Sequence, residues 1–128
     1  MRLLLSLLLL ATIGCTDTSD SQVTGGEFTV HFDNTKDHEL AKEIVEFWKK
    51  DSLITGKPQD VRLKRTNKGY DLMLISTKIK SAEELTFDDI KSLTKLQERL
   101  QTRVFRTEEV SLVIGDENFK PLFRPTLY

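Results

Sequence analysis

Apolar residues that recur every three or four positions predict two amphipathic helices. In the first segment, the positions from Leu40 to Trp48 alternate one apolar face with one charged face, and we expect a helix over residues 36–52. In the second, apolar side chains step by three or four from Phe87 to Val104. Thr86, followed three residues later by an aspartate, resembles a capping box and would begin this helix, which should end near residue 105.

Four shorter segments alternate apolar and polar residues or are nearly all apolar, as half-buried or central strands do. They cover residues 28–32, 61–65, 70–75 and 110–114. A turn at residues 67–69 predicts a hairpin between the second and third, with Gly69 free to take a positive φ.

The order strand, helix, strand, strand, helix, strand predicts an α+β fold. Specifically, we expect the ferredoxin-like βαββαβ arrangement, an antiparallel sheet with two helices on one face. In that arrangement the strand at residues 61–65 lies at an edge. Its basic residues Arg62, Lys64 and Arg65 would then discourage pairing with another molecule.

The first residues of the chain predict an export signal with a lipid anchor. A leucine-rich run over residues 3–10 follows Arg2, and it is shorter than the roughly 20 apolar residues that span a bilayer. The sequence Thr-Ile-Gly-Cys that ends at Cys15 resembles the lipobox of bacterial lipoproteins, although Thr12 stands where that family prefers leucine. The resemblance implies that Cys15 is acylated, with palmitate or a similar chain, and becomes the new N-terminus. The alternative is a plain signal peptide with a chance cysteine.

The domain organisation follows from this signal. We expect a signal peptide over residues 1–14, the lipidated Cys15 and a flexible polar tether over 15–26, and one α+β domain with an irregular C-terminal tail over 27–128. The anchor would hold the protein in the cell envelope, on the periplasmic side or at the cell surface. Cys15 is the single cysteine, so it has no disulfide partner within the chain.

Composition narrows the function further. The chain has 128 residues, of which 38% are hydrophobic and 30% charged, and this suits one small domain. Its formal net charge of −1 argues against a general nucleic-acid binder, which should be strongly basic. The segments 40–48, 60–70, 100–105 and 110–119 are similar to an uncharacterised small α/β module of bacterial envelope-associated proteins. That resemblance implies no active residues.

Candidate chemistry is sparse. His31 and His38 are predicted on different elements, so we expect no metal site, no cofactor and no enzymatic activity. The exception is the sheet face opposite the helices, which would carry an apolar strip with charged neighbours, a pattern typical of contact surfaces. The candidate binding residues on that face are His31, Arg62, Lys64, Asp71, Met73, Ile75 and Val113.

Several functions therefore stay open. The preferred hypothesis is a lipid-anchored, non-enzymatic module that binds a protein partner on the open face or contributes to an envelope assembly. A second is a small-ligand site between that face and the tail. A third is an enzyme that uses His31 and Asp71 on neighbouring strands as an acid–base pair. Against the first, the tail could fold over the face as core, through Phe119, Leu122, Phe123, Leu127 and Tyr128.

Overall fold

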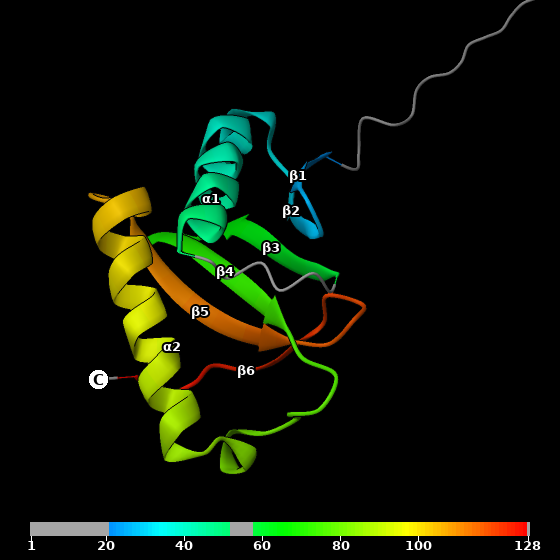
Figure 1. Ribbon diagram of the computed structural model, residues 1–128, viewed down its shortest axis with the longest axis vertical. Helices are drawn as coiled ribbons and strands as arrows, with labels where there is room; N and C mark the ends of the chain where they lie inside the picture. Colours follow the sequence, from blue (N-terminus) through cyan, green and yellow to red (C-terminus); the bar gives the residue numbers. More distant parts are fainter. Residues whose placement is uncertain (1–20, 52–57, 128) are drawn as a thin grey trace, which may run out of the picture.

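A computed structural model describes residues 21–51 and 58–127, which form one sheet and two helices (Figure 1). The strands are β1 (Ser21–Gly25), β2 (Phe28–Phe32), β3 (Gln59–Arg65), β4 (Gly69–Ile75), β5 (Glu109–Gly115) and β6 (Pro121–Phe123). The helices are α1 (His38–Lys50) and α2 (Phe87–Leu100), and α2 continues as a π-helical turn over Gln101–Phe105. The capping box predicted at Thr86 is present and begins α2.

The sheet order differs from the prediction. The six strands lie in the order of the sequence, β1-β2-β3-β4-β5-β6, with β2/β3 and β4/β5 parallel and the other pairs antiparallel. The predicted ferredoxin-like antiparallel sheet is therefore wrong, although the α+β class is correct. The physical reason is that each helix connects two adjacent parallel strands, so no third strand lies between them as it does in a split βαβ unit.

Strand β3 is central rather than at an edge, because it pairs with β2 on one side and β4 on the other. The proposed role of its basic residues in protecting an edge is accordingly wrong. Arg62 and Lys64 point away from the helices because they alternate with the buried Val61 and Leu63. They belong to the open face of the sheet.

The strand β1 occupies part of the predicted tether. Residues 21–25 pair with β2, and Gly26 at φ 63° makes the turn between the two strands. Gly25 lies against α1, where an added Cβ would overlap Val45. The remainder of the tether, the signal segment and Cys15 lie outside the described residues.

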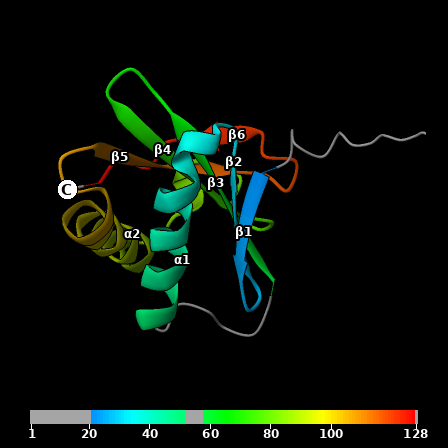
Figure 2. The same cartoon turned by 90° about the horizontal axis from the view of Figure 1, so that it is seen from above.

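The core lies between the helices and one face of the sheet (Figure 2). The Trp48 indole stacks on the Phe28 ring with a centroid distance of 4.5 Å and an interplanar angle of 10°. The largest fully buried side chains come from both helices and from the adjacent strands β2, β3 and β4. They are Phe28, Val30, Ile44, Leu63, Leu72 and Leu100. Both helices therefore cover the same face, as the sequence predicted.

Glutamine side chains of α2 and its π-helical extension cover the outer edge of β5. Gln101 Oε1 accepts a hydrogen bond from the Val110 amide at 3.1 Å, and Gln97 Oε1 accepts one from the Leu112 amide at 3.3 Å. Because β6 pairs only with the end of β5, these side chains satisfy backbone groups that have no strand partner there.

Among the helices that the structure describes, none combines the length and the apolar composition that a membrane span requires.

Candidate functional site

A hollow of about 460 Å³ lies on the open face of the sheet, between β3, β4, β5 and the C-terminal tail. Five of the predicted binding residues line it: Arg62, Lys64, Asp71, Met73 and Val113. The tail adds Asn118, Phe119, Pro121 and Arg124. The alternation of β3 and β4 explains this meeting, since Arg62 lies opposite Met73 and Lys64 opposite Asp71 in the antiparallel register.

Phe119 forms one wall of the hollow. Its backbone takes a left-handed φ of 61°, and its ring centroid lies 4.9 Å from that of the His31 ring. The Arg62 guanidinium carbon lies 5.5 Å from the same centroid, which is within reach of a cation–π contact. His31 thus contacts the wall of the hollow rather than its interior.

Arg124 fastens the tail across the sheet. Its Nη1 and Nη2 donate to the two carboxylate oxygens of Asp71 at 2.9 Å and 2.7 Å, a bidentate pair. This hydrogen bond raises the pKa of Arg124 above its ordinary value. Beyond it, Leu127 packs against the main core. The tail therefore covers part of the open face, with Val113 only 4% exposed, and leaves the hollow beneath it.

The turn that presents Phe119 depends on Asp116. One carboxylate oxygen of Asp116 accepts hydrogen bonds from the amides of Asn118 at 2.8 Å and Lys120 at 3.0 Å. These bonds, the one from Lys120 above all, lower the pKa of Asp116 below its ordinary value of 3.8, because they favour the ionised carboxylate.

Acid should release this turn. Because the folded state lowers the pKa of Asp116, its stabilisation is present above pH 3.8 and is lost as the pH falls through the lower folded value. We expect the amide resonances of Asn118 and Lys120 to shift with a midpoint below that pH in NMR spectra. Asp116→Ala should abolish this titration and move the Phe119 ring resonances at neutral pH. Unchanged Phe119 resonances in the variant would show that the turn forms without the carboxylate.

The cations at the hollow are not equivalent. Three have a carboxylate partner: Arg62 pairs with Asp33, Arg65 with Asp37 and Arg124 with Asp71. The Lys64 side chain makes no ion pair or hydrogen bond with any residue in the described ranges. Asp71 lies opposite Lys64 in the register, but both of its oxygens are engaged by Arg124.

The structure does not bring His31 and Asp71 together as an acid–base pair. Strand β3 lies between their strands, so they are not on neighbouring strands as expected. His31 Nε2 instead lies 2.9 Å from Asp60 Oδ1, and Asp71 holds Arg124. Within residues 21–51 and 58–127, no three His, Cys, Asp or Glu side chains are grouped closely enough to hold a metal ion.

Ile75, the remaining predicted binding residue, lies at the other end of β4. It lines a second hollow of about 470 Å³ with Trp48, Gln59 and Glu117. Gln59 Oε1 is buried there and has no hydrogen-bond partner within the described part of the chain. This hollow shares no lining residue with the one under the tail and is lined in part by the core residue Phe28, so Ile75 does not belong to the site on the open face.

No protein-family model matches the chain, and neither the curated proteins nor the solved structures contain a match.

Proposed function

We propose that this protein is a lipid-anchored, non-enzymatic binding module of the cell envelope, which holds its ligand in the hollow under the C-terminal tail. The observation that carries the proposal is that this hollow combines charged groups with an apolar floor and brings together five of the predicted binding residues. Its volume of about 460 Å³ is in the range of about 300–1,000 Å³ that is common for small-molecule sites.

The covering tail favours a small ligand over a broad protein interface. An interface with a protein partner usually needs about 800 Å² of accessible surface from each side. Here Phe119 and Arg124 already occupy part of the face that such a partner would use. A protein partner would therefore have to insert a small group into the hollow, as a small molecule would.

The proposed anchor would keep this site near the membrane. Strand β1 begins at Ser21, six positions after Cys15, and six steps of extended chain reach at most about 20 Å. Two or three acyl chains on one cysteine would anchor the domain stably, since a single chain gives only marginal binding. The domain would then face the periplasm or the cell exterior.

Replacing Cys15 by alanine tests the anchor. We expect the native protein to fractionate with membranes after a carbonate wash, and Cys15→Ala to appear in the soluble fraction or as an unprocessed precursor. Mass spectrometry of the native protein should find acyl chains on Cys15. An unmodified thiol, or a variant that is processed and still membrane-bound, would contradict the proposal.

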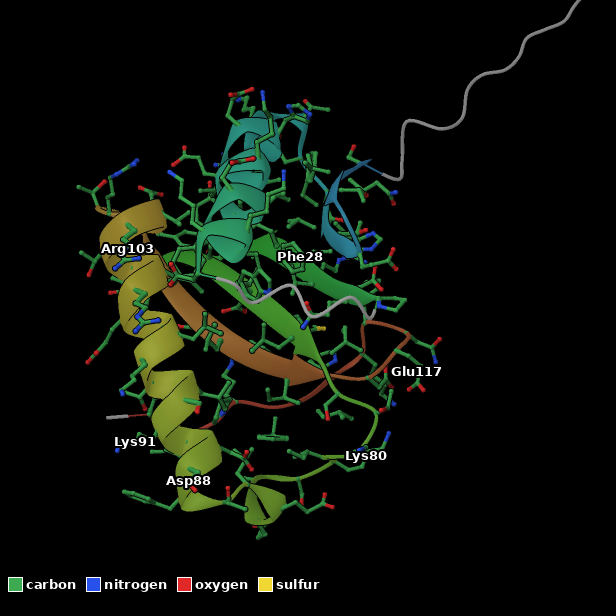
Figure 3. The ribbon with its side chains drawn as sticks, viewed as in Figure 1. Phe28, Lys80, Asp88, Lys91, Arg103 and Glu117 are labelled. Atoms are coloured by element: carbon green, nitrogen blue, oxygen red, sulfur yellow. The ribbon has the colours of Figure 1, made fainter. Side chains whose placement is uncertain are left out.

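Site-specific photo-crosslinking tests the hollow. A benzoylphenylalanine in place of Asn118, at the rim, should give an adduct in the intact membrane that mass spectrometry can weigh. The matched control replaces Lys91, an exposed residue of α2 that is not part of the hollow (Figure 3). Equal adducts at both positions would indicate nonspecific contact and would count against this site.

A further inference from the structure

The hollow under the tail has a composition that specifies its ligand more closely. We infer that it binds a singly charged carboxylate on a compact apolar group, with the carboxylate on Lys64 and the apolar group against Met73, Val113 and Phe119. This inference rests on the proposed function, because it names the ligand class of the same site.

The charge of the ligand follows from the ion pairs at the hollow. Each arginine that lines it already has a carboxylate partner, namely Asp33, Asp37 or Asp71. Lys64 is thus the one lining cation without such a partner among the residues that the structure describes. One surplus positive charge matches one negative charge, whereas a doubly charged phosphate would bring a second charge that nothing there neutralises.

The walls suit a carboxylate in particular. Arg124 is already occupied by the Asp71 carboxylate, so the donors left for a ligand are those of Lys64 and the unused ones of Arg62. Lys64 offers an ammonium group with three donors on a flexible chain, and a guanidinium such as that of Arg62 carries five N–H donors. Arg62 uses Nη2 toward Asp33, so its other donors could support a carboxylate on Lys64.

The apolar part of the ligand follows from the floor and the wall. Met73 and Val113 are register partners on β4 and β5, and they form an apolar floor on the face that points away from the helices. The Phe119 ring stands over Arg62 and His31, where it can pack edge-on or offset against a second ring. A phenyl group on a short chain would bury its surface between floor and wall.

The test measures the binding of 3-phenylpropionate to the full chain, reconstituted into phosphatidylcholine nanodiscs, by equilibrium dialysis with empty nanodiscs as the blank. Two probes of the same shape accompany it: the neutral 3-phenylpropionamide and the doubly charged 2-phenylethyl phosphate. We expect the carboxylate to bind about tenfold more tightly than the amide, as for one hydrogen-bonded charge pair. We expect the phosphate to bind more weakly than the carboxylate.

Two substitutions of matched chemistry locate the charge. Lys64→Gln should reduce the affinity for 3-phenylpropionate about tenfold and leave that for the amide unchanged. Lys68→Gln removes an exposed lysine in the hairpin loop that does not line the hollow, and it should change neither affinity. Both positions are exposed, so folding should be retained in each variant.

Each other outcome overturns the inference. Equal binding of the acid and the amide, or tighter binding of the phosphate, would exclude a recognised monocarboxylate. An equal effect of both lysine variants would place the charge effect outside the hollow. Absence of binding by all three probes would also exclude this ligand class, while an adduct at Asn118 but not at Lys91 would leave the proposed binding function standing.

Discussion

Replacing Asp37 with alanine should lower the free energy of unfolding by about 3 kcal/mol. Asp37 is 2% exposed, and its Oδ1 accepts hydrogen bonds from Tyr70 Oη at 2.9 Å and from Arg65 Nε at 3.1 Å. This carboxylate joins the start of α1 to the hairpin of β3 and β4. Without it, the buried Tyr70 hydroxyl loses its acceptor and the Arg65 side chain, which is half-exposed, must turn to solvent.

The pKa of Tyr70 reflects the same cluster. Burial raises it above the ordinary value of 10.0, and the hydrogen bond to Asp37 raises it further. Both causes favour the protonated phenol, which is the form that donates to the carboxylate. The Tyr70 hydroxyl therefore remains a donor at neutral pH, so the cost of removing Asp37 should be fully present there.

Urea unfolding followed by the fluorescence of Trp48 measures this loss. Trp48 is the single tryptophan of the chain, is 5% exposed and stacks on Phe28, so its emission reports the packing of α1 on β2. The control is Asp33→Ala, which removes the ion pair with Arg62. This pair is more exposed, since 51% of the Asp33 side chain and 35% of the Arg62 side chain are accessible to solvent. It should cost less than about 1 kcal/mol. A similar loss in both variants would contradict a special role for the buried carboxylate.

Periodicity predicted the helices and the four inner strands because it records which side chains are buried. The face of α1 with Ile44 and Trp48 is buried as expected, and so is the face of β2 with Phe28 and Val30. The same pattern carries no information on whether the strand after a helix pairs directly with the strand before it, and the predicted strand order was therefore wrong.

The two outer strands escaped prediction for different reasons. β1 contains one apolar residue of any size, Val23, and its structure depends on pairing with β2 rather than on its own composition. β6 has three residues and begins with Pro121, which weakens any strand pattern in the sequence. Both are edge strands of the sheet.

The candidate site was predicted on its sheet side, and a pocket between that face and the tail was one of the open alternatives, but the residue that fastens the tail was not predicted. Lys64 and Met73 were assigned to the open face from strand alternation alone, and both line the hollow. Arg124 was missed because the tail has no periodicity that would place it. One indication was available in the sequence: Asp71 is a charged residue in an otherwise apolar strand, and a buried or half-buried carboxylate needs a cation.

The hairpin predicted at Gly69 is present, but the reason why this position needs glycine differs from the predicted one. The hairpin turn before β4 predicted a positive φ at this glycine, but among the described glycines only Gly26 has one, at 63°. At Gly69 the requirement is space instead. An added Cβ would lie 2.8 Å from the backbone nitrogen of Glu109 and would overlap its carbonyl oxygen, since the two residues are register partners in β4 and β5.

These two causes predict different mutational results. Asparagine tolerates a left-handed backbone but still carries a Cβ. Gly69→Asn and Gly69→Ala should therefore each lower the free energy of unfolding by about 2 kcal/mol, because the backbones of β4 and β5 must separate to admit the new atom. Gly26→Asn, where φ is the requirement, should cost less than about 1 kcal/mol.

The same Trp48 unfolding experiment decides between them, supported by hydrogen exchange at the amides of β5. The amides of Ser111 and Val113 face β4, since those of Val110 and Leu112 point to the other edge of β5 and bond glutamines. If space is the cause, exchange should accelerate at Ser111 and Val113 in both Gly69 variants and remain slow in Gly26→Asn. A Gly69→Asn variant as stable as the native protein, with Gly69→Ala destabilised, would instead show that the backbone angle matters. The close approach of Gly69 to Glu109 would then not limit how tightly β4 and β5 pair.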